Sequence, residues 1–263
     1  MGRIEPETAR TILELAEPQL HGLPKVVIQF AQFYAFVREK SGPGEPYKWD
    51  TDSRLQMCVA LSRLVQPTSV SLRNSARVRY NSDSTVSDIS MSDISAVGID
   101  TVLARNPQRD WLTEDEAVRL RELIKRVDSS ALPDRASRAL WYHEYAARTY
   151  YVEVRWNLVS TALEALVHVE KFMSTRQFKS RVSQLAQELG VTGFGVAEAE
   201  RAYDLRSRLA HGQSLGGISD PDRALYESME LTLRLAILRS TEDDQFAAIL
   251  RNDEEIRKRW PLI

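Results

Sequence analysis

A run of apolar residues at helical spacing, from about Arg135 to Phe172, constrains the fold of this chain more than any other stretch. The residues that recur at intervals of seven are Tyr145, Val152, Val159 and Leu166. Trp156 and Leu163 each lie four residues after a member of that series, which places them along the same side of an α-helix. The pattern therefore predicts a long helix with a continuous packing seam, which could be broken once near Tyr151.

Two further helices are marked by their ends. The segment Thr113–Glu116 is a capping box, in which the Thr hydroxyl and the last Glu carboxylate bind free backbone N–H groups at a helix start. This helix is expected to run to about Val127. Ser174 or Thr175 can cap another helix, which is expected to end at Gly190.

The C-terminal part of the chain is also helical in pattern. Asp220 and Pro221 supply an N-cap and a first-turn proline for a helix that reaches Arg239. Apolar residues between Phe246 and Trp260 mark a final amphipathic segment. Residues 111–263 are thus expected to form one α-helical bundle.

The N-terminal part carries mixed signals. Residues 26–37 are densely apolar and aromatic, and their period fits either a helix or a buried strand. Apolar spacing from Leu55 to Val65 predicts a helix that ends before Pro67, because a residue preceding proline is pushed out of the helical conformation.

Short strands are expected between Val70 and Tyr80. Residues 81–95 are rich in Ser and Asp and could be a mobile loop or an edge hairpin, and their composition favours the loop. Residues 104–110 lack periodicity and contain an Asn-Pro breaker, which makes them the expected domain boundary. The chain is therefore predicted to be mainly α, with a small mixed α+β region, residues 1–110, before the helical bundle.

Composition narrows the classes of function. The 35 basic and 37 acidic residues leave a net charge of −2, so any binding of a polyanion must come from local clusters. A single cysteine, no signal-peptide pattern and no long apolar run predict a soluble cytoplasmic protein without a membrane span. No spacing of His, Cys and carboxylates suggests a metal, and no phosphate-binding loop is present, so no cofactor is expected.

Chemistry is concentrated in the segment Tyr203–Gly212, at the end of a predicted helix. Arg206 supplies a fixed positive charge and His211 an imidazole, and Gly212 suits a helix stop. The apolar stripe of this helix consists of Ala199, Ala202, Leu205 and Leu209.

An Arg and a His separated by four residues, within a helical half, resemble the motif of the HEPN superfamily, most closely that of the Apea-like HEPN domains of bacteria. The resemblance covers about residues 140–263 and includes the segments 156–166 and 178–182 besides Arg206 and His211. It implies a helical bundle that pairs into a homodimer and cleaves RNA without a metal. Many nuclease members place Asn, Asp or His directly after the motif Arg, where this chain has Ser207.

The resemblance also implies roles for the two motif residues. Arg206 would hold the scissile phosphate, and His211 would move a proton between the ribose 2′-hydroxyl, or the leaving oxygen, and solvent. The product would carry a 2′,3′-cyclic phosphate. Such proteins often act in bacterial anti-phage defence or as toxins, and the N-terminal region would then sense a trigger or bind a regulatory partner.

Further residues could contact the substrate. They are Arg208, Lys179, Arg181, Glu164 and Asn157. Asn157 and Glu164 share a polar face of the long helix, which could border the cleft, although the pattern favours a solvated or dimer-facing stripe. Lys179 and Arg181 belong to a basic run beside Phe172 and Phe178, which could stack on bases or pack inward.

The geometry of the motif leaves an alternative open. On an ideal helix the directions of Arg206 and His211 are about 140° apart, so their convergence needs an opened last turn or a second copy of the chain. Arg206 could instead pair with a surface carboxylate while His211 closes the helix C-terminus, where a cation is favourable. The bundle would then be a non-catalytic dimerisation or ligand-sensing module.

Overall fold

The computed structural model divides the chain into two compact units, Met1–Val59 with Ser71–Val97, and Ala60–Val70 with Gly98–Ile263. The residues that it describes are 2–3, 33–34, 51–67, 74–80, 86–93, 112–129, 132–149, 151–213 and 218–263. The predicted boundary at 104–110 and most of the ambiguous segment 26–37 therefore lie outside the described residues. The second unit holds all of the predicted site residues.

Strands occur in the first unit. β1 (Gly2–Arg3) pairs antiparallel with β2 (Phe33–Tyr34), so a piece of the ambiguous segment 26–37 is strand. β3 (Asn74–Tyr80) pairs antiparallel with β4 (Val86–Asp93), with an irregularity at Arg79 and Tyr80. The loop that composition favoured for residues 81–95 is thus wrong at β4, where the hairpin alternative applies. A mixed α+β organisation for the whole of residues 1–110 stays a prediction.

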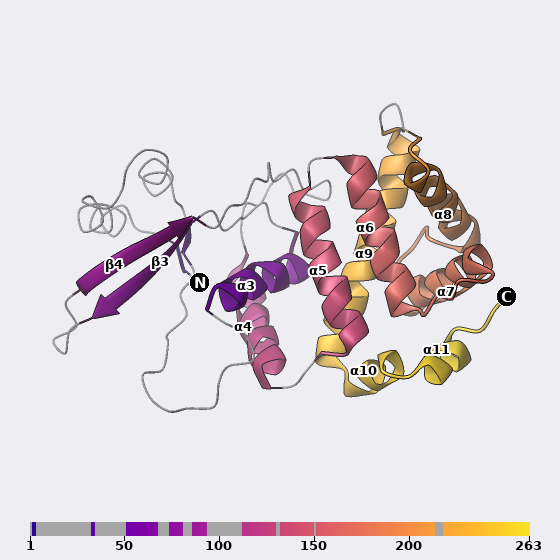
Figure 1. The fold of residues 1–263 in the computed structure, drawn as a ribbon. Helices are drawn as coiled ribbons and strands as arrows, with labels where there is room; N and C mark the ends of the chain where they lie inside the picture. Colours follow the sequence, from indigo (N-terminus) through magenta and orange to yellow (C-terminus); the bar gives the residue numbers. More distant parts are fainter. Residues whose placement is uncertain are drawn as a thin grey trace. The chain divides into compact units, whose positions relative to one another are not determined.

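Helices make up the described part of the second unit (Figure 1). In chain order they are α3 (Thr51–Val65, shared with the first unit), α4 (Glu114–Ser129), α5 (Asp134–Arg148), α6 (Val152–Leu166), α7 (Ser174–Glu188), α8 (Val196–Ala210), α9 (Asp220–Glu242), α10 (Asp244–Leu250) and α11 (Asp253–Arg259). α5 packs on α6 and α9, while α8 packs on α6 and α7. This confirms a mainly α protein with a helical bundle.

The long predicted helix is broken where the sequence allowed a break. α5 ends at Arg148, and Tyr151, in an extended conformation, precedes α6. α6 ends at Leu166, several residues before the predicted end at Phe172. The α6–α7 connection, residues 167–173, holds two non-glycine residues with positive φ, His168 at 54° and Met173 at 58°.

Helix ends follow the sequence with small shifts. The Thr113 N–H donates to the Glu116 carboxylate at 2.8 Å and the Glu116 N–H donates to the Thr113 hydroxyl at 3.4 Å, which confirms the capping box. α3 ends at Val65, as its proline predicts. The N-cap of α9 is Ser219 rather than Asp220, because the Ser219 hydroxyl accepts the Asp222 N–H at 3.3 Å. Met173, not Ser174 or Thr175, precedes α7.

Two tryptophans anchor the bundle core. Trp156 is fully buried on α6 and donates its indole N–H to the Ala202 carbonyl on α8 at 3.0 Å. Trp260 packs edge-on against Phe246 and donates to the Glu188 carboxylate at 3.0 Å, which fixes the C-terminal helices to α7. The Trp156 contact sets the position of α8, the helix that carries the Arg206–His211 motif.

A charged layer lies inside the bundle between α3, α5 and α9. It consists of Arg63, His143, Glu144, Arg148, Glu230 and Arg234. Glu144 accepts from Arg63 and, at 2.7 Å, from Arg148; the His143 ring contacts the Glu230 carboxylate at 2.7 Å. His143 is therefore a buried structural residue.

Among the described residues, no helix is long and apolar enough to cross a membrane.

Candidate functional site

The helix α8 lies against the bundle through its predicted apolar stripe. Its buried positions include Ala199, Ala202, Leu205 and Leu209, all four of the expected residues. Burial of that stripe fixes the rotation of the helix, because side chains at these spacings share one face. Arg206 and Arg208 consequently project from the remaining faces, half-buried and exposed respectively.

The C-terminal end of α8 is closed by backbone hydrogen bonds. The Gln213 N–H donates to the Arg208 carbonyl at 3.1 Å and the Gly212 N–H donates to the Leu209 carbonyl at 3.0 Å, the pattern of a Schellman motif. Gly212 has φ 78°, a conformation that suits glycine because it has no Cβ. The predicted helix stop is confirmed, and His211 is the last residue before it.

His211 presents its imidazole to solvent. The residue is exposed, and within the described part of the chain its ring makes no hydrogen bond or ion pair. A nitrogen base at the surface can accept or release a proton without disturbing the fold.

Arg206 is held by two neighbours. Its guanidinium donates to the Glu164 carboxylate on α6 at 3.2 Å, and it lies over the Tyr203 ring, 5.5 Å from the ring centroid. Side-chain exposures of 29% for Arg206 and 16% for Glu164 leave one side of the pair open to solvent. The group we call the Arg206 cluster comprises Arg206, Glu164, Tyr203 and Ser174.

Tyr203 connects Arg206 to the start of α7. Burial raises the pKa of Tyr203; its neighbour Ser174 acts to lower it, and Glu164 acts to raise it further. The phenol thus lies beside both side chains, and its ring also packs on Phe178 with 4.8 Å between centroids. Tyr203 was missed as a site residue, although its spacing of three before Arg206 places both on one helix face. Nothing in the sequence pointed to Ser174 as its neighbour.

The structure does not bring Arg206 and His211 together within one chain. α8 is helical through Ala210, so the last turn does not open before His211. No contact between the two side chains occurs in the described residues, and only Arg206 belongs to a side-chain cluster. Convergence through a second copy of the chain stays a prediction.

Arg208 and Asn157 lie outside the Arg206 cluster. Arg208 is exposed and donates to the Gln213 side chain at 3.0 Å. Asn157 is half-buried on α6, two turns before Glu164 on the same face, and its side chain makes no hydrogen bond to another described residue. Asn157 therefore keeps free polar groups on the α6 face that also carries Glu164.

The basic run divides into paired, buried and free cations. Lys179 pairs with Glu200 at 2.5 Å. Arg181 is 3% exposed, and burial lowers its pKa; it donates to the carbonyls of Val167 and His168. This placement fits support of the α6–α7 connection rather than the predicted substrate contact. The exposed cations of the run are Lys171 and Arg176.

The two phenylalanines of this region have opposite surroundings. Phe178 is fully buried against Tyr203, whereas Phe172 is 78% exposed. Inward packing thus applies to Phe178, and only Phe172 is free to stack on a base.

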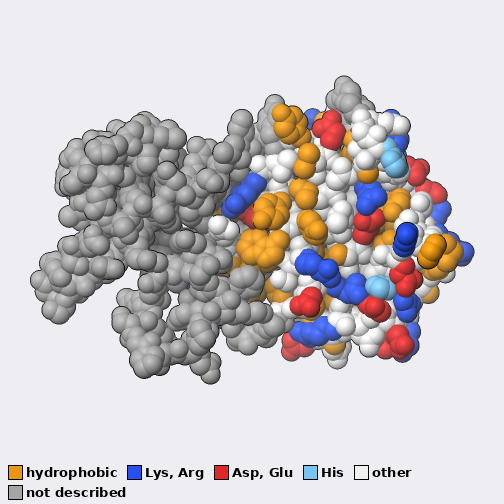
Figure 2. Space-filling model, viewed as in Figure 1, with side chains coloured by type: hydrophobic (Ala, Val, Ile, Leu, Met, Phe, Trp, Pro, Cys, Tyr) orange, Lys and Arg blue, Asp and Glu red, His pale blue; other side chains and the backbone are white. Residues whose placement is uncertain are grey.

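Figure 2 shows one face of the molecule, on which basic and acidic side chains of the helical unit are interspersed. That face carries no uniformly basic field.

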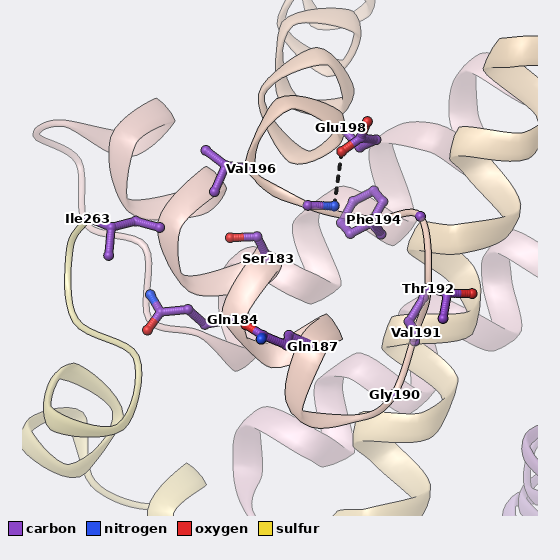
Figure 3. Close-up of a pocket in the computed structure, with 12 residues that line it drawn as sticks. Ser183, Gln184, Gln187, Gly190, Val191, Thr192, Phe194, Val196, Glu198 and Ile263 are labelled. Carbon is purple, nitrogen blue, oxygen red and sulfur yellow. Dashed lines mark hydrogen bonds between the residues drawn. The ribbon is translucent and has the colours of Figure 1, made fainter.

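An open hollow of about 420 Å³ lies at the α7–α8 loop, away from the Arg206 cluster. In Figure 3, Gln184, Gln187, Phe194 and Ile263 surround it. Its one acidic side chain, Glu198, accepts the Gly195 N–H at 3.0 Å and is occupied as a helix cap. No predicted site residue lines this hollow, and its side chains offer no base beside a nucleophile.

No protein-family model, curated protein or solved structure matches the chain. The described residues hold no cluster of His, Cys, Asp or Glu suited to a metal ion. What the site can do chemically therefore follows from its own groups. The Arg206 cluster offers a fixed cation for an anion, and His211 offers a group that transfers protons.

Proposed function

We propose that the chain is a metal-independent endoribonuclease of the HEPN type, which binds RNA and acts in the cytoplasm as a homodimer through its helical bundle. The observation that carries the proposal is the accessibility of both motif side chains. Arg206 is half-exposed and already oriented by Glu164 and Tyr203, and His211 is exposed at a closed helix end.

The expected reaction is internal transfer at one phosphate. The 2′-oxygen bonds to phosphorus as the bond from phosphorus to the 5′-oxygen breaks, which leaves a 2′,3′-cyclic phosphate and a 5′-hydroxyl. His211 takes the proton of the 2′-hydroxyl or returns one to the 5′-oxygen. Arg206 releases the Glu164 carboxylate and binds the phosphate oxygens in its place through its fixed N–H donors. Asn157 and Arg208 would contact neighbouring sugar and phosphate groups.

A homodimer would bring Arg206 and His211 side chains from two copies of the chain close together. In a two-fold symmetric pair the same surface meets itself, so the α8 ends of both copies can line one cleft. The proposed biological setting is anti-phage defence or a toxin system. In either setting the N-terminal region would respond to a trigger or to a regulatory partner.

A second candidate function is a non-catalytic HEPN module for dimerisation or ligand sensing. The Arg206–Glu164 pair favours it, because a bridge between α6 and α8 is also what a purely structural arginine would make. Ser207 in the position after the motif Arg favours it as well.

The test is RNA cleavage in the presence of a chelator. We expect the full chain, incubated with total RNA in EDTA, to produce fragments that end in 2′,3′-cyclic phosphate. His211→Ala should lose about 10²–10⁴-fold in rate, the usual contribution of a positioned proton-transfer group. Gln213→Ala is the matched control, since it alters an exposed neighbour of Gly212 without removing an ionisable group.

Each outcome decides between the two candidates. Chelator-resistant cleavage that His211→Ala abolishes and Gln213→Ala preserves supports the nuclease. Equal cleavage by His211→Ala and the unmodified chain would count against it. Absence of cleavage together with a stable dimer supports the non-catalytic module.

A further inference from the structure

The α6–α7 connection displays its apolar side chains outward. Phe172 is 78% exposed and Met173 60%, and apolar side chains that are exposed next to one another can mark an interaction site. The connection bends through positive φ at His168 and at Met173. Residues with a Cβ rarely adopt that conformation, and where they do the surrounding structure enforces it, often at a functional site.

Buried and paired side chains hold this connection in shape. The Gln177 side chain, itself 3% exposed, accepts the Glu170 N–H at 2.8 Å and donates to the Phe172 carbonyl at 2.7 Å. Arg181 binds the carbonyls of Val167 and His168 from inside. The backbone on both sides of Phe172 is therefore fixed before any ligand arrives.

The His168 ring is fixed from two directions. Arg135 on α5 approaches one ring nitrogen at 3.2 Å, and Arg257 on α11 approaches the other at 3.2 Å. Arg257 also donates to Glu170 at 2.6 Å. A rigid display of this kind lowers the entropy lost when the displayed groups bind a partner.

Free positive charge flanks the displayed aromatic ring. Lys171 and Arg176 are exposed, and neither pairs with a carboxylate of the described residues, in contrast to Lys179. Ser174, two residues after Phe172, lies beside Tyr203 and belongs to the Arg206 cluster. An exposed ring between free cations matches the alternation of bases and phosphates along a single strand of nucleic acid.

We infer that Phe172 is a base-stacking residue that binds an unpaired nucleobase of single-stranded RNA next to the Arg206 cluster. Lys171 and Arg176 contact the phosphates on either side of that base. This inference rests on the proposed function and specifies its substrate as single-stranded rather than duplex RNA, because a paired base does not expose its face. The charge around the ring favours a polyanion over a second copy of this chain as the occupant.

The experiment measures RNA affinity in the non-cleaving His211→Ala background of the full chain. The probes are a short fluorescently labelled single-stranded RNA of mixed sequence and the corresponding duplex, followed by anisotropy. We expect Phe172→Ala to weaken binding of the single strand by about 5- to 150-fold, the equivalent of the roughly 1–3 kcal/mol that stacking of one base contributes. Phe172→Trp should retain binding, and Phe172→Leu should lose nearly as much as Ala.

The matched control is Tyr145→Ala, which removes another exposed aromatic ring, 58% exposed, from α5. It should leave the affinity unchanged. Equal affinities for Phe172→Ala and Tyr145→Ala would overturn the inference, as would full binding by Phe172→Leu. A change from dimer to monomer in Phe172→Ala by sedimentation would also overturn it, because the surface would then be an interface between copies.

The two proposals fail in different ways. If the unmodified chain cleaves RNA and Phe172→Ala binds and cleaves it equally well, the nuclease stands and the stacking role fails. If the His211→Ala chain binds neither RNA probe and the unmodified chain cleaves none, both proposals fail together.

Discussion

The charged layer and the Arg206 cluster are built from the same residue types in opposite surroundings. Glu144 and Arg63 are almost completely buried, at 2% and 1% exposed, and form an ion pair inside the bundle. Glu164 and Arg206 keep contact with water, so either can change partner at low cost. A close arginine–carboxylate pair is therefore structural in the charged layer. In the Arg206 cluster, by contrast, another anion can replace the carboxylate.

Atoms left without partners sharpen the contrast. In the charged layer, His143 Nδ1, Arg148 Nη2 and Arg234 Nε are buried and find no hydrogen bond among the described residues. The charged layer should therefore tolerate the loss of further hydrogen bonds poorly, because each unsatisfied buried polar group lowers the stability of the fold. No buried side-chain atom of the Arg206 cluster lacks a hydrogen bond in this way within the described part of the chain.

The largest expected effect is on stability, from Glu144→Ala. Removal of this carboxylate leaves Arg63 and Arg148 without it inside the bundle, and loss of one partner of a buried pair typically costs about 3–5 kcal/mol. The free energy of unfolding, measured by urea denaturation with circular dichroism, should fall by that amount. Glu122→Ala, which breaks the exposed pair with Lys125, is the control and should leave the midpoint unchanged. A similar midpoint for both variants would remove the distinction between the two regions.

Glu230 should make the stability of the charged layer depend on pH. Burial acts to raise the pKa of Glu230, but the hydrogen bond with His143 and the charges of His143 and Arg234 outweigh it, so its pKa lies below the ordinary 4.5. A carboxylate with a lowered folded pKa stabilises the fold above its unfolded pKa, and this stability is lost as pH falls through the folded value. We therefore expect the stability of the unmodified chain to decline once the pH drops below 4.5.

Glu230→Gln tests this link. The variant should lose roughly 1.5–3 kcal/mol at neutral pH, the contribution of a hydrogen bond to a charged group. Its denaturation midpoint should then fall less steeply than that of the unmodified chain on acidification. Parallel pH profiles for the two proteins would contradict the assignment.

The smallest expected effect on stability comes from Glu164→Gln in the Arg206 cluster. Because the pair is partly exposed, the free energy of unfolding should change by less than about 1 kcal/mol. The affinity of the His211→Ala chain for RNA should increase, since Arg206 no longer exchanges a carboxylate for a phosphate. A loss of stability comparable to that of Glu144→Ala would show that the Arg206–Glu164 pair is structural and would favour the non-catalytic module.

Local signals in the sequence predicted the helices well. The Thr113 capping box, the stop before Pro67 and the turn at Gly212 each depend on one residue's own conformational limits, and all three are confirmed. The predicted N-cap of α9, Asp220, lies one residue after the observed N-cap, Ser219. Both residue types are good caps, and the sequence pattern does not rank them.

Contacts between distant residues could not be predicted in the same way. The pairing of His143 with Glu230 spans 87 positions, and the support of the α6–α7 connection by Arg181 depends on a backbone conformation that no spacing signals. Of the candidate site, the sequence located Arg206 and included Glu164, which the structure places in contact with it. It could not distinguish the exposed Phe172 from the buried Phe178, because both lie in the same basic run.

The α6–α7 connection draws its shape from helices far apart in the chain. His168 and Glu170 are held by Arg257 on α11, and Arg135 on α5 meets both His168 and Asp253. A substitution in α11 would thus change the position of the Phe172 ring without any direct contact with it. Over evolutionary time, α5, the connection and α11 should therefore change in concert, and a library that randomises one of them alone should yield few active variants.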